Sequence, residues 1–324
     1  MQYGSIVGIE KPVSRIGQGT VMLGPDREEE GFALLDAVFE GGVNLYDSSH
    51  IYGGGESERV FGRWVAARGI RDRVVLLTKG AHHDASGPRV RPECITGDLT
   101  GSLERLGFDF IDLYVLHRDD PTVPVGPIVE VLNEHHKAGR IGAFGGSNWT
   151  HDRIREANEY AAEHRLTPFA VSSPHFSLAE MVEPPWPNCV SIAGPRHEEA
   201  REWYAAAHTT LVPWSSLAGG FLSGRYTRES LEGAAEDDRA AANAKRCYGS
   251  EDNCRRLERL TETAAERGIS VAQAAIAYVL SQPLSMFPLT AAWTPEEAHA
   301  NAAAGEIRFS PAEVAWLDLQ AETR

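Results

Sequence analysis

Short apolar runs of strand character alternate with longer segments of helical periodicity along almost the whole chain of 324 residues. This alternation indicates parallel strands joined by crossover helices, because parallel strands need long connections. About eight strands are predicted, at residues 15–20, 43–47, 74–79, 110–117, 141–146, 169–173, 210–214 and 286–291. Helices are predicted between them, at residues 28–40, 57–68, 92–106, 125–137, 151–163, 198–208 and 271–281.

Glycines follow several of these helices where a left-handed cap would end them: Gly41, Gly69, Gly107 and Gly139. Eight β/α units in about 250 residues match a closed (β/α)8 TIM barrel, whereas a doubly wound sheet usually has fewer strands and a GxGxxG motif that this chain lacks. We therefore expect an α/β chain in which residues 1–324 form a single barrel domain. Long βα loops are expected at 178–196 and 221–259, with an extra C-terminal helix at 311–321.

The composition limits the classes of molecule that this chain is expected to bind. A net charge of -15 argues against nucleic acid or an anionic membrane as the main partner, since a phosphate surface requires clustered Lys and Arg. No segment approaches the roughly 18 apolar residues of a membrane span, and the N-terminus does not resemble a signal peptide, so a cytoplasmic protein is expected. Cysteine spacing favours reduced thiols, and no metal is expected. The sequence leaves open whether the chain forms a homo-oligomer.

Four polar residues at or near strand ends suggest chemistry: Asp47, Tyr52, Lys79 and His117. In a barrel the carboxyl ends of the strands share one rim, so these side chains should meet. The set suits hydride transfer coupled to proton transfer, with the phenol of Tyr52 as the proton donor. We expect Lys79 to lower the pKa of Tyr52, Asp47 to hold Lys79 charged, and His117 to polarise the substrate oxygen.

Several motifs carry a resemblance to a known family. Residues 42–53 read GVNLYDSSHIYG and are followed by GESE at 55–58; LLTK at 76–79, DLYVLH at 112–117, GGSN at 145–148 and PWSSLAGG at 213–220 come in the same order. Over about residues 17–301 the chain resembles the aldo-keto reductases. The resemblance implies an oxidoreductase that interconverts a carbonyl and an alcohol with NAD(P)(H), and it places that family's catalytic tetrad on Asp47, Tyr52, Lys79 and His117.

The resemblance also implies cofactor contacts that do not depend on a Rossmann motif. Ser147 and Asn148 match residues that bind the nicotinamide carboxamide, Trp214 matches the ring that stacks on the nicotinamide, and Ser215, Leu217 and Gly219 match the pyrophosphate loop. Arg225 would add charge beside that loop. The complete expected set is Gly19, Thr20, Asp47, Ser147, Asn148, Ser173, Trp214, Ser215, Leu217, Gly219, Arg225, Ala291, Trp293, Glu297 and Asn301.

Some positions depart from the family pattern. Ser173 stands where relatives usually carry glutamine, and Ala291 replaces a usual glycine. Trp293 and Glu297 stand where relatives that prefer NADP(H) commonly carry donors or cations, and a carboxylate suits the free ribose diol of NAD better than a phosphate. The sequence thus favours NAD(H) or dual use over the family norm of NADP(H). Alternatively, Glu296 and Glu297 only stabilise a helix N-terminus as acids of its first turn.

The expected substrate is an aldehyde, a ketone or a sugar-like polyol. Polar groups are expected at the pocket from His50, His82, His83, Arg118 and Asp119, and stacking surfaces from Trp149, Phe176 and Trp186. One alternative is a regulatory or redox-sensing module that holds a nicotinamide cofactor with little steady turnover. Another is a barrel enzyme of unrelated chemistry, such as a lyase.

Overall fold

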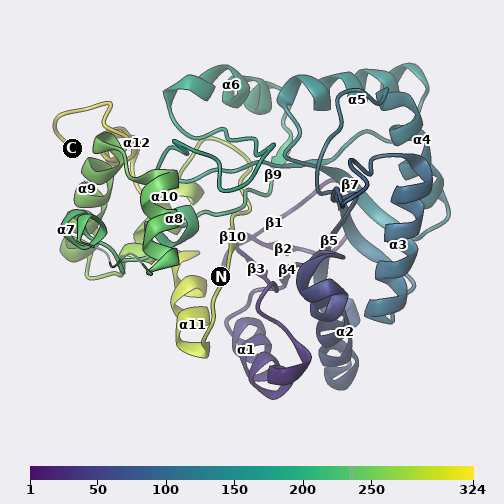
Figure 1. Cartoon of the computed structure of the whole chain (residues 1–324), viewed down its shortest axis with the longest axis horizontal. Coiled ribbons are helices and arrows are strands. Elements are labelled where there is room, and N and C mark those ends of the chain that lie inside the picture. Colours follow the sequence, from purple (N-terminus) through teal and green to yellow (C-terminus); the bar gives the residue numbers. More distant parts are fainter. Residues whose placement is uncertain (234, 236) are drawn as a thin grey trace.

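The computed structural model describes residues 1–233, 235 and 237–324. Eight parallel strands form one sheet in the order β10-β3-β4-β5-β6-β7-β8-β9, with helices arranged around it (Figure 1). Their bounds are β3 (Gly17–Gly19), β4 (Leu45–Asp47), β5 (Val75–Gly80), β6 (Ile111–Leu116), β7 (Ile141–Ser147), β8 (Val171–Ser173), β9 (Thr210–Leu211) and β10 (Leu289–Thr290). The predicted (β/α)8 fold and all eight strand positions are confirmed.

The two ends of the sheet are joined through the segment before β10. Leu211 forms a parallel bridge with Met286, and the backbone N–H of Phe287 donates to the carbonyl oxygen of Leu211 at 2.8 Å. Two residues further on, the N–H of Leu289 donates to the carbonyl oxygen of Pro213 at 2.9 Å. These bonds close the barrel.

Most predicted helices begin and end within two residues of their predicted positions. They are α1 (Glu28–Glu40), α2 (Glu56–Arg68), α3 (Pro92–Leu106), α4 (Val125–Lys137), α5 (His151–Glu163), α6 (Glu198–Ala206) and α10 (Val271–Leu280). A further helix, α11 (Pro295–Ala304), follows β10, and the predicted C-terminal helix is α12 (Pro311–Leu317), shorter than expected. Of the described helices, none combines the length and apolar character needed to cross a bilayer.

The prediction of a long loop at residues 221–259 was wrong. This segment contains α7 (Arg228–Glu232), α8 (Arg239–Tyr248) and the beginning of α9 (Glu251–Arg267). Each helix is capped at its start by a side chain that accepts a hydrogen bond from a backbone N–H of the first turn. The accepting residues are Thr227, Asp238 and Ser250 respectively. Leu257 and Leu260 lie on the buried face of α9. Because charged residues outnumber the apolar residues of this narrow face, the composition of the segment did not indicate a helix.

One predicted glycine cap was also wrong. Gly69, Gly107 and Gly139 have φ values of 62°, 68° and 70°, as a left-handed cap requires. Gly41 instead has φ -67°, and Gly42 takes the positive value of 83°. The helical conformation thus extends one residue further than predicted before the chain turns into β4.

The barrel interior is packed with the inward side chains of its strands: Leu45, Val75, Leu77, Leu113, Val115, Val171 and Leu289. Ile6 and Val13 join this cluster from the hairpin formed by β1 (Tyr3–Gly4) and β2 (Val13–Ser14). The hairpin lies at the amino ends of the strands, since the N–H of Ser14 donates to the side chain of Asn44, just before β4. It plugs that end of the barrel.

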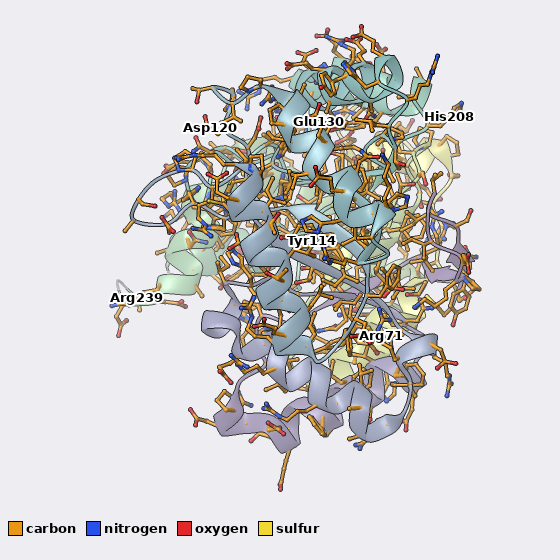
Figure 2. All side chains as sticks on the ribbon, turned by 90° about the vertical axis from the view of Figure 1, so that its right-hand side faces the viewer. Arg71, Tyr114, Asp120, Glu130, His208 and Arg239 are labelled. Atoms are coloured by element: carbon orange, nitrogen blue, oxygen red, sulfur yellow. The ribbon has the colours of Figure 1, made fainter. Side chains whose placement is uncertain are left out.

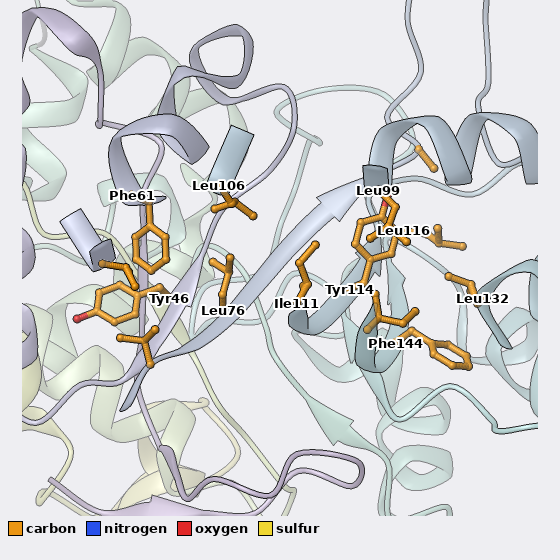
Figure 3. Packing of buried hydrophobic residues seen from close by; sticks show 14 of the residues in the cluster. Tyr46, Phe61, Leu76, Leu99, Leu106, Ile111, Tyr114, Leu116, Leu132 and Phe144 are labelled. Atoms are coloured by element: carbon orange, nitrogen blue, oxygen red, sulfur yellow. The ribbon is translucent and has the colours of Figure 1, made fainter. Parts of the chain in front are cut away.

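Outward side chains of the strands pack against the helices. Figure 3 shows Tyr114 and Leu116 of β6 near Leu99 and Leu132 of the covering helices. Their neighbours Leu113 and Val115 point inward, as the two-residue period of a strand requires. Figure 2 shows the molecule turned by 90° about the vertical axis, with the side chains drawn. Asp120, which follows β6, lies at the upper left of this view, and Arg71, which precedes β5, lies toward the lower right.

Candidate active site

The four predicted catalytic residues meet at the carboxyl ends of β4, β5 and β6. Lys79 forms an ion pair with Asp47, and its Nζ lies 3.3 Å from the hydroxyl oxygen of Tyr52. The ring centroids of Tyr52 and His117 are 6.1 Å apart. All four residues line one cavity of about 940 Å³. The sequence prediction that these side chains would converge agrees with this geometry.

Strand register and a glycine turn produce this convergence. Asp47 is paired with Leu77 across β4 and β5, so Asp47 and Lys79 finish neighbouring strands. The chain then turns sharply at Tyr52–Gly55, where Gly53, Gly54 and Gly55 have φ values of 57°, 65° and 94°. Residues with a Cβ rarely adopt three such values in succession. The turn returns the chain into α2 and leaves Tyr52 at the cavity.

Burial and charge act against each other at this site. Burial lowers the pKa of Lys79, but the Asp47 carboxylate and Tyr52 outweigh it, so the pKa of Lys79 is raised and the ammonium is kept. Burial raises the pKa of the Tyr52 phenol; Lys79 opposes this shift without reversing it. The predicted net lowering of the pKa of Tyr52 was therefore wrong. The phenol is protonated at neutral pH, which is the form that can donate to an oxyanion.

His117 is held neutral beside Tyr52. Burial, Lys79 and Arg118 together hold the pKa of His117 well below its usual range. Its Nδ1 lies 3.0 Å from the hydroxyl oxygen of Ser49. When the Ser49 hydroxyl donates to Nδ1, Nε2 carries the proton and can donate to a substrate oxygen. Sequence analysis did not single out Ser49, because a serine two residues after a strand has no distinctive signal.

Most residues predicted to bind the cofactor line the same cavity: Gly19, Asp47, Ser147, Asn148, Trp214, Ser215, Leu217, Gly219, Arg225, Ala291, Trp293, Glu297 and Asn301. Thr20 and Ser173 do not. The Thr20 hydroxyl is buried and lies 2.7 Å from that of Ser57. The Ser173 hydroxyl is buried without a partner, while its carbonyl oxygen accepts from the Ser147 hydroxyl at 2.9 Å. Ser223 and Ser270 line the cavity but were not predicted.

The predicted aromatic contacts for a sugar divide between cavity and core. Trp186 is 45% exposed, lines the cavity and stacks on Trp214 with 5.5 Å between centroids. Trp149 is fully buried against Phe169, and Phe176 stacks on Tyr278 in the core. The roles predicted for Trp149 and Phe176 were therefore wrong. Their side chains follow strand ends but point between the sheet and the helices.

The far end of the cavity is formed by the N-terminus of α11. A carboxylate oxygen of Glu297 accepts from the backbone N–H of Trp293 at 2.8 Å, and the N–H of Glu297 donates to the Thr294 hydroxyl at 3.3 Å. These two bonds support the alternative that Glu297 stabilises a helix N-terminus. Trp293 is 58% exposed. Because Glu297 also lines the cavity, its charge still acts on whatever lies there.

A family model and a curated relative agree on the family. The model of the Aldo/keto reductase family matches residues 15–321. The uncharacterized oxidoreductase YrpG of Bacillus subtilis (strain 168) is 28% identical over 322 residues, covering 95% of this chain and 92% of the relative. The aldo-keto reductase YhdN of the same strain is 32% identical over 300 residues, covering 87% and 82%.

Another relative is a probable voltage-gated potassium channel subunit beta of Oryza sativa subsp. japonica, 29% identical over 294 residues, covering 87% of this chain and 84% of the relative. Among solved structures, the glycerol dehydrogenase AKR11B4 from Gluconobacter oxydans superposes with a TM-score of 0.79 at 23% identity, covering 98% of this chain and 94% of that one. Sequence, site geometry and fold agree: the chain belongs to the aldo/keto reductase family.

Proposed function

We propose that the protein interconverts a carbonyl compound and the corresponding alcohol, using NAD(P)(H) as hydride carrier and Tyr52 as the acid and base. The observation that carries this proposal is the Tyr52 hydroxyl 3.3 Å from the Lys79 ammonium, inside a cavity long enough to reach α11. A binding module would not need an ionisable phenol beside a buried ion pair. Membership of an oxidoreductase family supports the same conclusion.

The cavity offers what a dinucleotide requires along its length. Trp214 provides an aromatic wall, and the side-chain groups of Ser147 and Asn148 are near the tetrad. Gly219 and Gly220, with φ values of 61° and 96°, bring backbone close to the cavity without a side chain. Arg225 and Ser270 supply a cation and a hydroxyl for phosphate groups. When bound there, the nicotinamide cofactor supplies or accepts the hydride.

Residues of the chain then polarise the substrate oxygen and transfer the proton to it. His117, neutral and fixed by Ser49, donates a hydrogen bond that polarises the carbonyl. Tyr52 gives its proton to the oxygen as negative charge develops there. Lys79, held by Asp47, stabilises the phenolate left behind. In alcohol oxidation the same phenolate takes the proton back.

For cofactor choice we propose NAD(H) or dual use. Glu297 places a carboxylate at the α11 end of the cavity, where a 2'-phosphate would meet a like charge. The ribose diol of NAD can instead donate to a carboxylate. The capping bond of Glu297 to Trp293 is compatible with this role, because a carboxylate has several acceptor sites.

Steady-state absorbance at 340 nm with NADH and NADPH, across aldehydes, ketones, sugars and polyols, tests the proposal. We expect sustained turnover with at least one carbonyl, abolished in Tyr52→Phe. Silence with both cofactors would contradict the enzymatic proposal. A single burst without steady turnover would instead favour the regulatory or redox-sensing alternative.

A further inference from the structure

Arg118 is a buried cation without a carboxylate partner among the described residues. Four Lys or Arg side chains are buried there, and three of them contact a carboxylate: Lys79 with Asp47, Arg153 with Asp119, and Arg256 with Glu180. Arg118 is 5% exposed, and no described carboxylate lies within 4.0 Å of its guanidinium. A buried charge without a counterion is costly, so a bound anion would stabilise this position.

The hydrogen bonds of Arg118 leave part of its guanidinium unused. Nη1 donates to the carbonyl oxygen of His117 at 3.2 Å, and Nε is buried without a partner in the described part of the chain. The neighbouring acid, Asp119, is turned away and accepts from Arg153 at 3.1 Å. The backbone carbonyl of Arg118 accepts from the indole of Trp149 at 3.2 Å, which fixes the local backbone.

This guanidinium lies at the reacting end of the cavity. Arg118 lines the cavity together with Tyr52 and His117, and its Cζ atom lies 5.8 Å from the centre of the Trp186 ring. Its charge reaches the tetrad: burial raises the pKa of Tyr52 while Lys79 and Arg118 lower it. A ligand group held by Arg118 would therefore lie beside the carbonyl that Tyr52 serves.

The other charged groups of the cavity leave this end cationic. Its carboxylates are Asp47, which is bound to Lys79, and Glu296 and Glu297 at the α11 end. The side chains around Arg118 are instead imidazoles, from His82, His83 and His117. This end can offer hydrogen-bond donors and positive charge to a substrate, and no unpaired carboxylate from the described residues opposes an anion there.

We propose that Arg118 binds an anionic group of the substrate, so that the enzyme acts on carbonyl compounds carrying a carboxylate or phosphate near the carbonyl, with oxo acids favoured over their neutral analogues. The inference rests on the proposed carbonyl–alcohol activity. Arginine suits this role because its planar guanidinium can give two parallel hydrogen bonds to a carboxylate or a phosphate. Trp186 would cover the apolar part of the same substrate.

The test compares matched substrates that differ in charge and little in shape. They are 4-carboxybenzaldehyde against 4-carbamoylbenzaldehyde, phenylglyoxylate against phenylglyoxylamide, and glyceraldehyde 3-phosphate against glyceraldehyde. We expect the anionic member of at least one pair to have a kcat/KM at least about tenfold higher, the usual scale for a hydrogen bond to a charged group. The first two pairs report on carboxylate and the third on phosphate.

Arg118→Met should remove this preference, so that kcat/KM falls at least about tenfold more for the anionic member of a pair than for the neutral member, whatever change in the Tyr52 phenol the two members share. Arg118→Lys should retain part of it, and the exposed Arg239→Met serves as the control. Equal kcat/KM for all three pairs in the wild type would overturn the proposal. So would an equal loss for both members in Arg118→Met. Should Arg118→Met fail to fold, the wild-type ratios and Arg118→Lys decide.

A binding measurement separates this inference from the proposed activity. Benzoate and benzamide are titrated into wild type and Arg118→Met by calorimetry, which needs no turnover. Benzoate bound by the wild type alone would support the anion site even if every carbonyl proved inert, in which case only the proposed activity fails. A wild type that binds neither compound and turns over neutral aldehydes as well as charged ones would leave the activity standing and remove the anion site.

Discussion

The ammonium nitrogen of Lys79 lies 3.3 Å from the phenolic oxygen of Tyr52, although 27 positions separate the two residues along the chain. Asp47 holds the ammonium from its other side. The phenol thus keeps its proton because of burial, yet has a cation beside it for the moment the proton leaves.

Replacing Tyr52 tests this arrangement most directly. Tyr52→Phe should lower kcat by about 10² to 10⁴, the usual range for losing a general acid. Affinity for the cofactor should stay nearly unchanged, because only the hydroxyl is removed. Steady-state rates and fluorescence titration with cofactor measure the two effects. Tyr160→Phe, which loses a hydroxyl bonded to Glu130 on the outer helices, is the control. Equal losses in rate and affinity would refute the assignment.

The pH dependence of alcohol oxidation reports the charge of Lys79. Oxidation requires the phenolate, so below the raised pKa of Tyr52 its rate should climb about tenfold per pH unit, whereas reduction, which uses the phenol, stays flat there. The double variant Asp47→Asn/Lys79→Met removes the cation without leaving a lone buried carboxylate. It should shift the rise in oxidation to higher pH, because Lys79 lowers the pKa of Tyr52 by more than Asp47 raises it, and both influences are gone. Superimposable profiles for both proteins would contradict the role of Lys79.

His175 should make the fold sensitive to acid. It is fully buried, with Nδ1 2.8 Å from the Ser191 hydroxyl and Nε2 3.2 Å from that of Tyr248, and burial together with His197 lowers its pKa to about 3. The unfolded chain has a histidine pKa near 6.5. The stabilisation from keeping this ring neutral is therefore complete above about pH 6.5. It is lost as the pH falls toward about 3, by up to about 1.4 kcal/mol per pH unit.

Urea unfolding at several pH values between 7.5 and 4.5 checks this effect. His175→Asn should be less stable than wild type at pH 7.5 but should lose stability less steeply toward acid. The exposed His164→Gln should follow the wild-type slope. Parallel curves for wild type and His175→Asn would show that His175 is not the acid-sensitive group.

Cofactor choice should respond to a single charge. Glu297→Gln keeps an oxygen that can accept from the Trp293 N–H, so the cap of α11 is preserved while the negative charge is removed. The ratio of dissociation constants should shift toward NADP(H) by about tenfold, as expected for relieving one close charge. The exposed Glu163→Gln, on α5 and outside the cavity lining, is the matched control. An unchanged ratio would leave Glu297 with a capping role alone.

The sequence predicts the barrel well because its signals are local. The strands and most helices follow from the two periodicities, and helix ends follow from glycines such as Gly69 and Gly107. Helix α9 was not predicted because charged residues outnumber Leu257 and Leu260, although Ser250 was a usable signal for the start of a helix. Side-chain direction after a strand is set by packing, which is why Trp149 lies in the core and Trp186 in the cavity.

The active site also has features that the sequence predicts and features that depend on packing. Strand ends predict that Asp47, Lys79 and His117 converge, since parallel strands share one carboxyl edge. The pKa of Tyr52 depends on how much water its hydroxyl loses, and no pattern of residues reveals that quantity. The sequence equally cannot show that Arg118 has no carboxylate partner among the described residues, because this depends on Asp119 pointing toward Arg153 instead.

The hairpin that carries Ile6 and Val13 fills the amino end of the barrel, at the opposite edge from the tetrad. The packing that stabilises the amino end of the barrel is therefore separated in space from the catalytic residues at the carboxyl end. Substitutions that stabilise the hairpin end should raise thermal stability without disturbing proton transfer at the tetrad. Substitutions in the loops at the carboxyl ends of the strands can change substrate preference without weakening the packing at the hairpin end.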